Sequence, residues 1–360
     1  MKANTPAGGP LHEPDPARTP DAGGSAVSAD SPLIVVLGAA GFVGSAVFRE
    51  LAQHPVRLRA VSRRKVPVPH DARAEIEVLS ADLTEPGQMA AAVAGADVVI
   101  HALAYIAGAS TWRIADGDTA AERVHVGLMQ DLLHALGDRA DSRATPTVLF
   151  TGSVTAAGST DKEVLDGTEP DRPKGYYERL KLQAERLLLA ADAAGTVRGA
   201  CLRLTTLYGY SAGSTARDKG IVSTMTRRAV AGEPLTMWHD GTVRRDLLHV
   251  DDAARAFWAA LPHMDVLGGK RWLIGTGRGA PLGEVFTEVS ALVAEQTGKQ
   301  PVPVVSVEPP EYAEVSDFRS VIVDSSAFRA ATGWTPQVSL GEGLRLTTQF
   351  CSGGRETEVS

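Results

Sequence analysis

From Leu33 onward, short apolar runs alternate with amphipathic stretches along the chain. Runs typical of strands are "LIVVLG", "VRLRAVS", "DVVIHALA", "TVLFTG" and "ACLRLTTLYG", and helix-like stretches such as "GSAVFRELAQ" and "EPGQMAAAVAG" lie between them. Strands that are apolar throughout, each followed by a helix, indicate parallel strands that are buried on both faces. The pattern predicts an α/β fold with a doubly wound parallel Rossmann sheet, because about six strands before residue 210 are enough for dinucleotide binding.

The amino-acid composition predicts where the tails and domains of the chain lie. Residues 1–31 are rich in Pro, Gly, Ala and Asp and have almost no large apolar side chains, so burial cannot offset the entropy lost on ordering them. We expect a disordered tail there, or residues added by an early start codon, and a flexible tail at 351–360. Residues 32–207 are predicted to form the nucleotide-binding domain, to which 243–263 return. Gly and Pro interrupt the later pattern, which predicts a smaller mixed α/β substrate domain from 208–242 and 264–350.

Charge and cysteine usage exclude several classes of function. The 360 residues are 44% hydrophobic with a formal net charge of −7, which leaves no basic surface for nucleic acid. No apolar run approaches the roughly 18 residues of a membrane span, and no apolar signal core is present at the N-terminus. Cys201 and Cys351 lack metal-ligand spacing, which argues against a metal site or disulfide framework. We expect a cytoplasmic protein without membrane or nucleic acid partners.

The first chemical motif is "VLGAAGFVGSAVFRELA", in which three glycines follow the first strand and begin a helix. The first glycine permits a tight turn, the second lets the backbone approach a pyrophosphate, and the third lets helix and strand pack closely. The helix N-terminus then faces the anion. Small-residue turns are common, but this position in a βαβ unit predicts nucleotide binding by Gly38, Ala40, Gly41, Phe42, Val43 and Gly44.

The end of the second predicted strand bears on which dinucleotide is bound. A carboxylate there would hold the ribose 2′-hydroxyl of NAD, whereas this strand ends in Ser62, Arg63 and Arg64. Two guanidinium groups could bind the 2′-phosphate of NADP(H), although either could be an ordinary solvated charge. The absent acid favours NADP(H) over NAD(H). After the third strand, Asp82 and Leu83 could flank the adenine, or Asp82 could be a turn or cap residue.

The stretch "GYYERLKLQAERLLL" predicts a helix that begins at two adjacent tyrosines. At about 100° per residue, Tyr177 lies on an apolar arc and Lys181 lies at its margin. The lysine could simply extend along the surface towards water. An ammonium one turn below a phenol would instead lower a pKa that is otherwise about 10, so that Tyr177 could exchange a proton near neutral pH. Residues expected outside the arc are Glu178, Arg179, Leu182, Gln183 and Glu185.

A predicted strand upstream, in "VLFTGSVTAAG", ends in hydroxyl residues at the edge of the sheet where doubly wound folds bind ligands. A serine at a strand end is ordinarily a turn former. Its position after a nucleotide loop and before a Tyr/Lys pair favours a role in chemistry. We predict that Ser153 contacts a substrate carbonyl and the Tyr177 oxygen, with Thr151 and Thr155 as alternatives in register.

Several motifs in order resemble the extended short-chain dehydrogenase/reductases, the NAD-dependent epimerase/dehydratase family, over roughly residues 33–350. They are GAAGFVG, Ser153, the Tyr177/Lys181 pair, "LRLTTLYG", "RRDLLHVDDAARAF" and "TGWTPQVSLGEGL". Within the family, "RDLLHVDD" after "MWHDGT", the stretch "AYIAGASTWRIADGD" and "GTEPDRP" resemble the 4-ketoreductases of actinomycete deoxysugar pathways. The resemblance implies that NADPH reduces a dTDP-4-keto-6-deoxyhexose, in making sugars that decorate polyketides, antibiotics and other secondary metabolites.

The resemblance also implies roles for single residues. Tyr177 would be the general acid, Lys181 would tune it and hold the nicotinamide ribose, and Ser153 would orient the carbonyl. Ala102 and Ala104 would line the cofactor after the fourth strand. Family habit implies a homodimer through two helices of the nucleotide domain.

On the substrate side, the resemblance implies that Arg245 meets the diphosphate and that Trp238, with Thr155, lies near the substrate. Arg245 could equally be a salt-bridged structural residue, and Trp238 could be part of the core. His125 stands where many relatives have an asparagine that supports the lysine, and its titration near neutral pH would make a proton relay pH-sensitive. Ala157 replaces a frequent tyrosine, which would enlarge the pocket.

Two other functions stay open at this stage. The first is a nucleotide-sugar epimerase or dehydratase with bound NAD, and the second is a noncatalytic NADP-sensing regulator. Dehydratases generally need an acidic pair after the strand-end hydroxyl, where this chain has Val154, Thr155 and Ala156. The threonines of "LTTLYG" replace an asparagine used by some epimerases, and sensors usually lack the Tyr/Lys pair, so a reductase is favoured.

Overall fold

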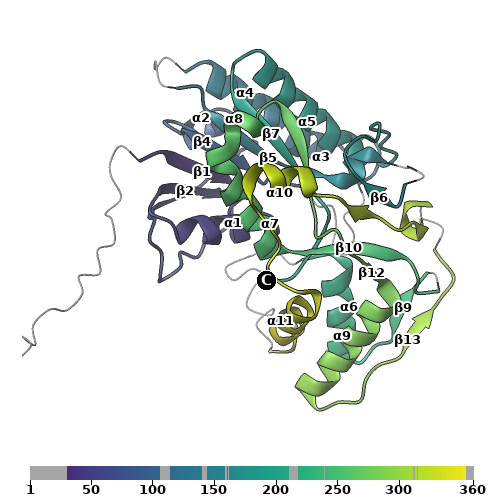
Figure 1. The fold of residues 1–360 in the computed structure, drawn as a ribbon. Coiled ribbons are helices and arrows are strands. Elements are labelled where there is room, and N and C mark those ends of the chain that lie inside the picture. The colour runs from purple at the N-terminus through teal and green to yellow at the C-terminus, as the bar shows by residue number, and fades with distance from the viewer. Residues whose placement is uncertain are drawn as a thin grey trace, which may run out of the picture.

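The computed structural model describes residues 31–105, 114–139, 144–158, 160, 162–210, 218–238, 240–310, 313 and 315–353. Nearly all of the predicted N-terminal tail and most of the C-terminal one lie outside these residues, as do 106–113 of "AYIAGASTWRIADGD" and His239 of "MWHDGT". In the described part, an α/β sheet domain lies beside a smaller group of helices and short strands around α6, α9 and α11 (Figure 1). No helix within these ranges is both long and apolar enough to cross a membrane.

The sheet domain is built on seven strands in the order β11-β7-β5-β4-β1-β2-β3. Every neighbouring pair is parallel. The strands are β1 (Leu33–Leu37), β2 (Arg57–Ser62), β3 (Glu75–Ser80), β4 (Val98–His101), β5 (Thr147–Ser153), β7 (Arg198–Leu204) and β11 (Lys270–Ile274). The predicted doubly wound parallel sheet is confirmed.

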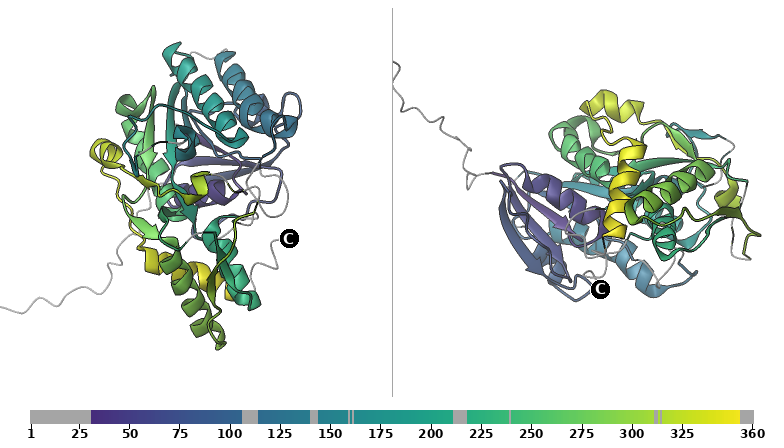
Figure 2. Two further views of the ribbon diagram at one scale, coloured as in Figure 1. Left: turned by 90° about the vertical axis from the view of Figure 1, so that its right-hand side faces the viewer. Right: turned by 90° about the horizontal axis from the view of Figure 1, so that it is seen from below.

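Helices cover both faces of this sheet, which explains why its central strands carry apolar residues towards both faces (Figure 2). On one face lie α1 (Phe42–Ala52) and α7 (Val250–Ala260), and on the other α2 (Gln88–Ala92), α4 (Leu128–Gly137) and α5 (Tyr176–Ala193). Successive side chains of a strand point to opposite faces. Accordingly Ile34 and Val36 belong to the first core, and Val35 and Leu37 to the second.

One segment lies elsewhere than predicted. We expected 264–350 to lie in the second domain, but Lys270–Ile274 forms β11, the edge of the seven-stranded sheet beside β7. Its sequence "KRWLI" begins with two charged residues, and only Ile274 is fully buried. An edge strand lacks the continuous apolar run that identified the central strands. The rest of the domain division stays a prediction.

The smaller group of elements contains three short sheets and a separate apolar core. The sheets are β12-β10-β8, β13-β9 and β14-β6. Their strands are β6 (Val164–Leu165), β8 (Thr206–Tyr208), β9 (Leu235–Met237), β10 (Arg244–His249), β12 (Gly279–Pro281), β13 (Val304–Ser306) and β14 (Ile322–Val323). The helices α6 (Ile221–Ala231), α9 (Leu282–Thr297) and α11 (Leu340–Ser352) bury Val222, Val289 and Leu344. Because α11 reaches Ser352 and Cys351 is buried, the predicted C-terminal tail begins too early.

Shorter elements complete the described chain. The α-helical pieces are α3 (Thr119–Glu122), α8 (Met264–Leu267) and α10 (Ser326–Thr332). A π-helical turn, η1 (Arg123–Gly127), runs from α3 into α4, and 3₁₀ turns occur at η2 (Val154–Ala157), η3 (Leu261–His263) and η4 (Val315–Phe318). Of these, η1 and η2 border the candidate active site.

Two buried aspartates fasten the C-terminal segments to the rest of the fold. Asp246 and Asp252, both in "RRDLLHVDDAARAF", are fully buried. Such carboxylates need hydrogen-bond donors. Asp246 accepts from the backbone amides of Thr276, Gly277 and Val323. Asp252 accepts from those of Gln337 and Val338, and its carbonyl accepts from Trp334 Nε1. The motif "RRDLLHVDDAARAF" is therefore hydrogen-bonded to the motif "TGWTPQVSLGEGL", and this contact has a structural role.

Candidate active site

The turn after β1 admits only glycine at two positions. Gly38 has φ +86°, and a Cβ there would lie 2.9 Å from the Ala102 carbonyl oxygen. At Gly44 a Cβ would lie 2.1 Å from the Gly38 carbonyl oxygen, so α1 packs directly on the turn. Gly41 is the N-cap of α1, and no side chain caps that end of the helix. The first amides of α1 are therefore available to an anion.

The carboxyl end of β2 brings two arginines to the side of this turn. Arg64 Nη2 donates to the Ala40 carbonyl at 3.2 Å, and the Arg64 amide donates to Ser62 Oγ at 3.2 Å. Arg63 is exposed and lies 3.6 Å from an oxygen of Asp82. The structure thus brings Ser62, Arg63 and Arg64 together beside the glycine turn, as the sequence pattern predicts.

Asp82 makes the contacts expected of a turn residue. Its carboxylate accepts from the Thr84 hydroxyl at 2.6 Å and from the Thr84 amide at 3.0 Å. These bonds, and then the Arg63 charge, hold the pKa of Asp82 below its usual value. Leu83 is buried in the core under α2 and α4. A contact of either residue with adenine stays a prediction.

Lys181 is buried and extends from α5 across to the end of β5. Its residue exposure is only 3%, its Nζ donates to the Thr151 carbonyl at 2.9 Å, and Nζ lies 4.8 Å from the centre of the Phe150 ring. Burial lowers the pKa of Lys181 to about 8. The alternative that this lysine lies along the surface is wrong, because α5 packs on the sheet at this point.

Tyr177 lies one turn before Lys181 and packs against the π-helical turn η1. Its ring meets that of His125 edge-on, with centroids 5.4 Å apart and an interplanar angle of 83°. Burial, and then the charge of Glu178, raises the pKa of the Tyr177 phenol well above its ordinary value. The predicted lowering of the Tyr177 pKa is therefore wrong, since loss of water around a phenolate and the charge of Glu178 both raise it. At neutral pH this phenol is protonated.

Two neutral histidines lie close to Lys181. His125 in η1 is 1% exposed, and its Nε2 accepts from the Tyr105 amide at 3.3 Å. Burial, followed by the charge of Lys181, lowers the pKa of His125 to about 3, so the predicted titration near neutral pH is wrong. His101, at the end of β4, has its pKa lowered to about 3 by the same two causes. His101 was not predicted as a site residue; the signal is a histidine inside the apolar run "DVVIHALA".

The hydroxyl residues at the end of β5 divide into two groups. Thr151 is buried, and its hydroxyl donates to the His101 carbonyl at 3.1 Å. Ser153 Oγ lies 2.8 Å from Thr155 Oγ1 and accepts from the Thr155 amide at 3.3 Å. Ser153 is the N-cap of η2 and Thr155 lies within it, and α5 contacts η2. Ser153 and Thr155 therefore remain the hydroxyl candidates, and Ala157, also in η2, is buried.

The predicted substrate residues are placed more loosely. Arg245 donates to the backbone carbonyls of Arg244, Asp317 and Arg319, and burial lowers the pKa of Arg245. It thereby holds the segment 317–319, and its contact with a diphosphate stays a prediction. Trp238 is half-buried. Ala102 borders Gly38, and Ala104 is exposed; contact of either residue with the cofactor stays a prediction.

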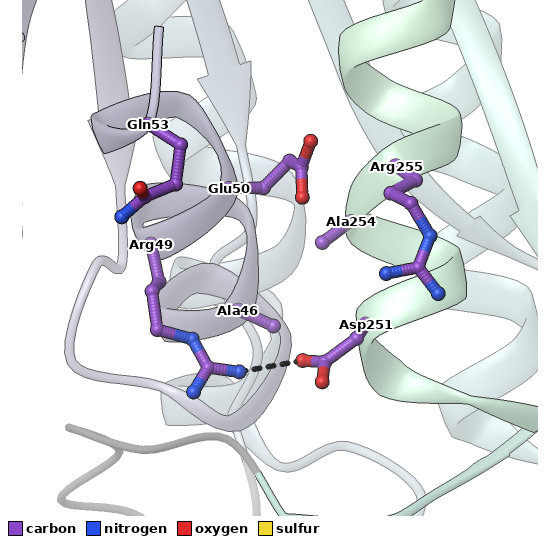
Figure 3. A pocket seen from close by; sticks show the side chains of 7 residues that line it. All are labelled: Ala46, Arg49, Glu50, Gln53, Asp251, Ala254 and Arg255. Carbon is purple, nitrogen blue, oxygen red and sulfur yellow. Dashed lines mark hydrogen bonds and ion pairs between the residues drawn. The ribbon is translucent and has the colours of Figure 1, made fainter. Parts of the chain in front are cut away.

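A pocket between α1 and α7 lies away from these residues (Figure 3). Arg49 Nη2 binds Asp251 Oδ1 across it at 2.7 Å. None of the predicted site residues lines it, and its helices cover the face of the sheet opposite α5. The candidate active site is instead the carboxyl edge of the sheet between β1 and β4, where the strand order reverses.

Comparison with known proteins decides the family. Residues 34–275, more than half of the chain, match the family described as NAD dependent epimerase/dehydratase family. The chain belongs to this family. This protein is therefore an enzyme of the epimerase/dehydratase group of oxidoreductases. The glycine turn and the Tyr/Lys pair agree with that membership.

Relatives of this epimerase/dehydratase family member have different activities. A dTDP-L-rhamnose 4-epimerase from Burkholderia thailandensis is 26% identical over 358 residues, covering 88% of this chain and 93% of that one. A 2-alkyl-3-oxoalkanoate reductase from Stenotrophomonas maltophilia is 27% identical over 270 residues, covering 72% and 75%. The solved structure of MoeE5 in complex with UDP-glucose and NAD has a TM-score of 0.72 at 27% identity, covering 91% and 100%.

Proposed function

We propose that this enzyme is an NADPH-dependent ketoreductase that reduces the C4 keto group of a dTDP-4-keto-6-deoxyhexose in deoxysugar biosynthesis. The observation that carries the proposal is a partly buried Tyr177 phenol, whose pKa is raised, on the same helix as a buried Lys181, beside the end of β5. A proton donor at that place suits reduction of a carbonyl.

The residues of the glycine turn suit a nicotinamide dinucleotide. The tight turn, in which a Cβ at Gly38 or Gly44 would collide with backbone, brings the uncapped start of α1 to a position that suits a pyrophosphate. Arg63 and Arg64 would hold the 2′-phosphate of NADP(H), and Lys181 the nicotinamide ribose. Bound NADPH supplies the hydride, which is the chemistry the protein itself lacks.

The chain's own residues would stabilise the charge and deliver the proton. Ser153 and Tyr177 would donate hydrogen bonds to the substrate carbonyl oxygen as negative charge grows on it. Tyr177 would then give its proton to that oxygen, and the Lys181 ammonium would stabilise the phenolate left behind. A phenol that keeps its proton suits this role, because reduction of a carbonyl needs a proton donor beside the oxygen.

The second candidate is a nucleotide-sugar 4-epimerase that retains NAD. It is favoured by the similarity to the dTDP-L-rhamnose 4-epimerase along nearly the whole of both chains, and by MoeE5, which was solved with UDP-glucose and NAD. An epimerase regenerates its cofactor in each turnover and therefore consumes none. No feature of the described site residues specifically favours a noncatalytic NADP sensor.

The deciding experiment follows NADPH oxidation by purified protein with enzymatically prepared dTDP-4-keto-6-deoxyglucose, and identifies the product by NMR. We expect stoichiometric loss of NADPH and a new hydroxyl at C4. Interconversion of dTDP-L-rhamnose with its C4 epimer, without loss of NADPH, would replace the reductase by the epimerase.

The two arginines beside the glycine turn give a cofactor prediction. In Arg63→Ala with Arg64→Ala, we expect the Kd of NADPH to rise about tenfold or more, since each charged hydrogen bond contributes about 1.5 kcal/mol. The Kd of NADH should change little, and both are measured by fluorescence titration. Arg73→Ala removes an equally exposed charge beyond the end of α1 and is the matched control. Equal losses for NADPH and NADH would contradict a 2′-phosphate site.

A further inference from the structure

A buried ion-pair network joins helix α5 to strand β7. Glu185 and Arg203 are 1% and 2% exposed. Arg203 Nε donates to Glu185 Oε2 at 2.8 Å, and Arg203 Nη2 donates to Glu185 Oε1 at 2.7 Å. This two-bond geometry is the strongest that arginine makes with a carboxylate.

The same guanidinium also holds the segment that leads into α5. Arg203 Nη1 donates to Asp171 Oδ1 at 2.8 Å, and the other oxygen of Asp171 accepts from Arg271 of β11 at 3.2 Å. Asp171 comes five residues before the start of α5 at Tyr176. One arginine thus fixes both the approach to the helix and its middle.

The network is adjacent to the reacting side chains. Glu185 lies one helical turn after Lys181, which itself lies one turn after Tyr177. Cys201 Sγ donates to Glu185 Oε2 at 3.1 Å, and a Cβ at Gly152 of β5 would lie 2.4 Å from that sulfur. Helix α5, β7 and the end of β5 are therefore in direct contact around the ion pair.

A buried ion pair contributes little net stability, because removing two charges from water costs about as much as their attraction returns. Its directional bonds nevertheless allow only one arrangement of the elements that carry it. An apolar contact between α5 and β7 would tolerate small shifts along the helix axis. A misplacement of about 1 Å at a reacting group can lower a rate by about 100-fold.

We propose that the network of Glu185, Arg203 and Asp171 is a positioning device that fixes α5, and with it Tyr177 and Lys181, against the end of β5. These are positioning residues, since they act through the helix and do not touch the substrate. The proposal rests on the proton-donating role of Tyr177 in the proposed function.

The main test variant is Arg203→Lys, which keeps the charge but loses the two-bond geometry and the third bond. We expect kcat to fall about tenfold with KM for the keto sugar and Kd for NADPH nearly unchanged. Hydrogen exchange of the amides in 176–185 should become faster. The matched control is Arg198→Lys. Arg198 lies on the same strand as Arg203, but its ion pair with Asp265 of α8 is exposed, so this variant should change neither kcat nor the hydrogen exchange of α5.

A second variant keeps the test decisive where Arg203→Lys does not fold. Glu185→Leu with Arg203→Met replaces both charges by apolar side chains of similar length, which buried ion pairs commonly tolerate. We expect a folded protein with a melting temperature near that of the wild type, faster exchange in α5 and the same loss in kcat. Wild-type kcat and exchange in either folded variant would overturn the proposal.

The exchange measurement separates this proposal from the proposed function. If the wild type consumes no NADPH with the keto sugar, the reductase assignment fails on its own. Exchange in α5 then still decides the network: faster exchange with unchanged melting temperature supports it, and unchanged exchange overturns it.

Discussion

Tyr177→Phe is expected to lower kcat by about 100- to 10,000-fold, the range that a positioned general acid contributes. The phenol is protonated at neutral pH because burial raises its pKa, so in the proposed reduction Tyr177 would supply the proton for the carbonyl oxygen. Phenylalanine keeps the edge-on packing with His125 but has no proton to give. Binding of NADPH should persist, and steady-state kinetics with a fluorescence titration measure both quantities.

The adjacent tyrosine is a matched control for this substitution. Tyr176 is the first residue of α5, and its hydroxyl lies 3.5 Å from Glu122 Oε2, whereas the Tyr177 ring packs on His125. Tyr176→Phe should keep turnover near that of the wild type. Turnover of Tyr177→Phe at the level of Tyr176→Phe would remove Tyr177 from the chemistry.

The central sheet could be predicted because its two faces are both covered. β1 is apolar throughout and β5 has an apolar, buried middle, and an apolar run between helices is the signature of this arrangement. The edges of the sheet do not carry that signature. β3 is mostly exposed, and we expected it as the third strand before Asp82. β11 begins with two charges, and only its pairing with β7 reveals it.

The buried side of α5 could not be predicted from periodicity. A helical wheel assumes one apolar face, yet Glu178, Leu182 and Glu185 are buried although we expected them outside the apolar arc. Glu185 can be buried because Arg203, on strand β7, supplies the positive charge that pairs with its carboxylate. Pairings between elements of this kind follow from the fold, not from the local pattern.

The sequence indicates which residue types could do chemistry at the candidate site, but it does not indicate their charge states. The residues Ser153, Tyr177 and Lys181 stand out from the sequence because hydroxyl, phenol and ammonium groups follow a nucleotide turn. The pKa values of Tyr177, Lys181 and His125 depend instead on how far water is excluded, which only the packed structure shows. Burial moves all three towards their neutral forms.

Gly44→Ala is expected to damage both the fold and the cofactor site. The new Cβ would lie 2.1 Å from the Gly38 carbonyl oxygen, which is backbone and cannot rotate away. Helix α1 must then move off the turn, at a cost of about 1–3 kcal/mol in the free energy of unfolding. Its first amides would leave the pyrophosphate, and losing one or two charged hydrogen bonds should raise the Kd of NADPH about 10- to 100-fold.

A second helical glycine separates this clash from the general effect of adding a methyl group. Gly341 lies in the first turn of α11, where a Cβ would come no closer than 3.3 Å, to the flexible end of Glu288. Gly341→Ala should raise stability by about 0.5–1 kcal/mol, because alanine loses less backbone entropy in a helix. Thermal unfolding and NADPH titration compare the two variants. If Gly44→Ala matched Gly341→Ala in both, the contact between α1 and the Gly38 turn would not govern nucleotide binding.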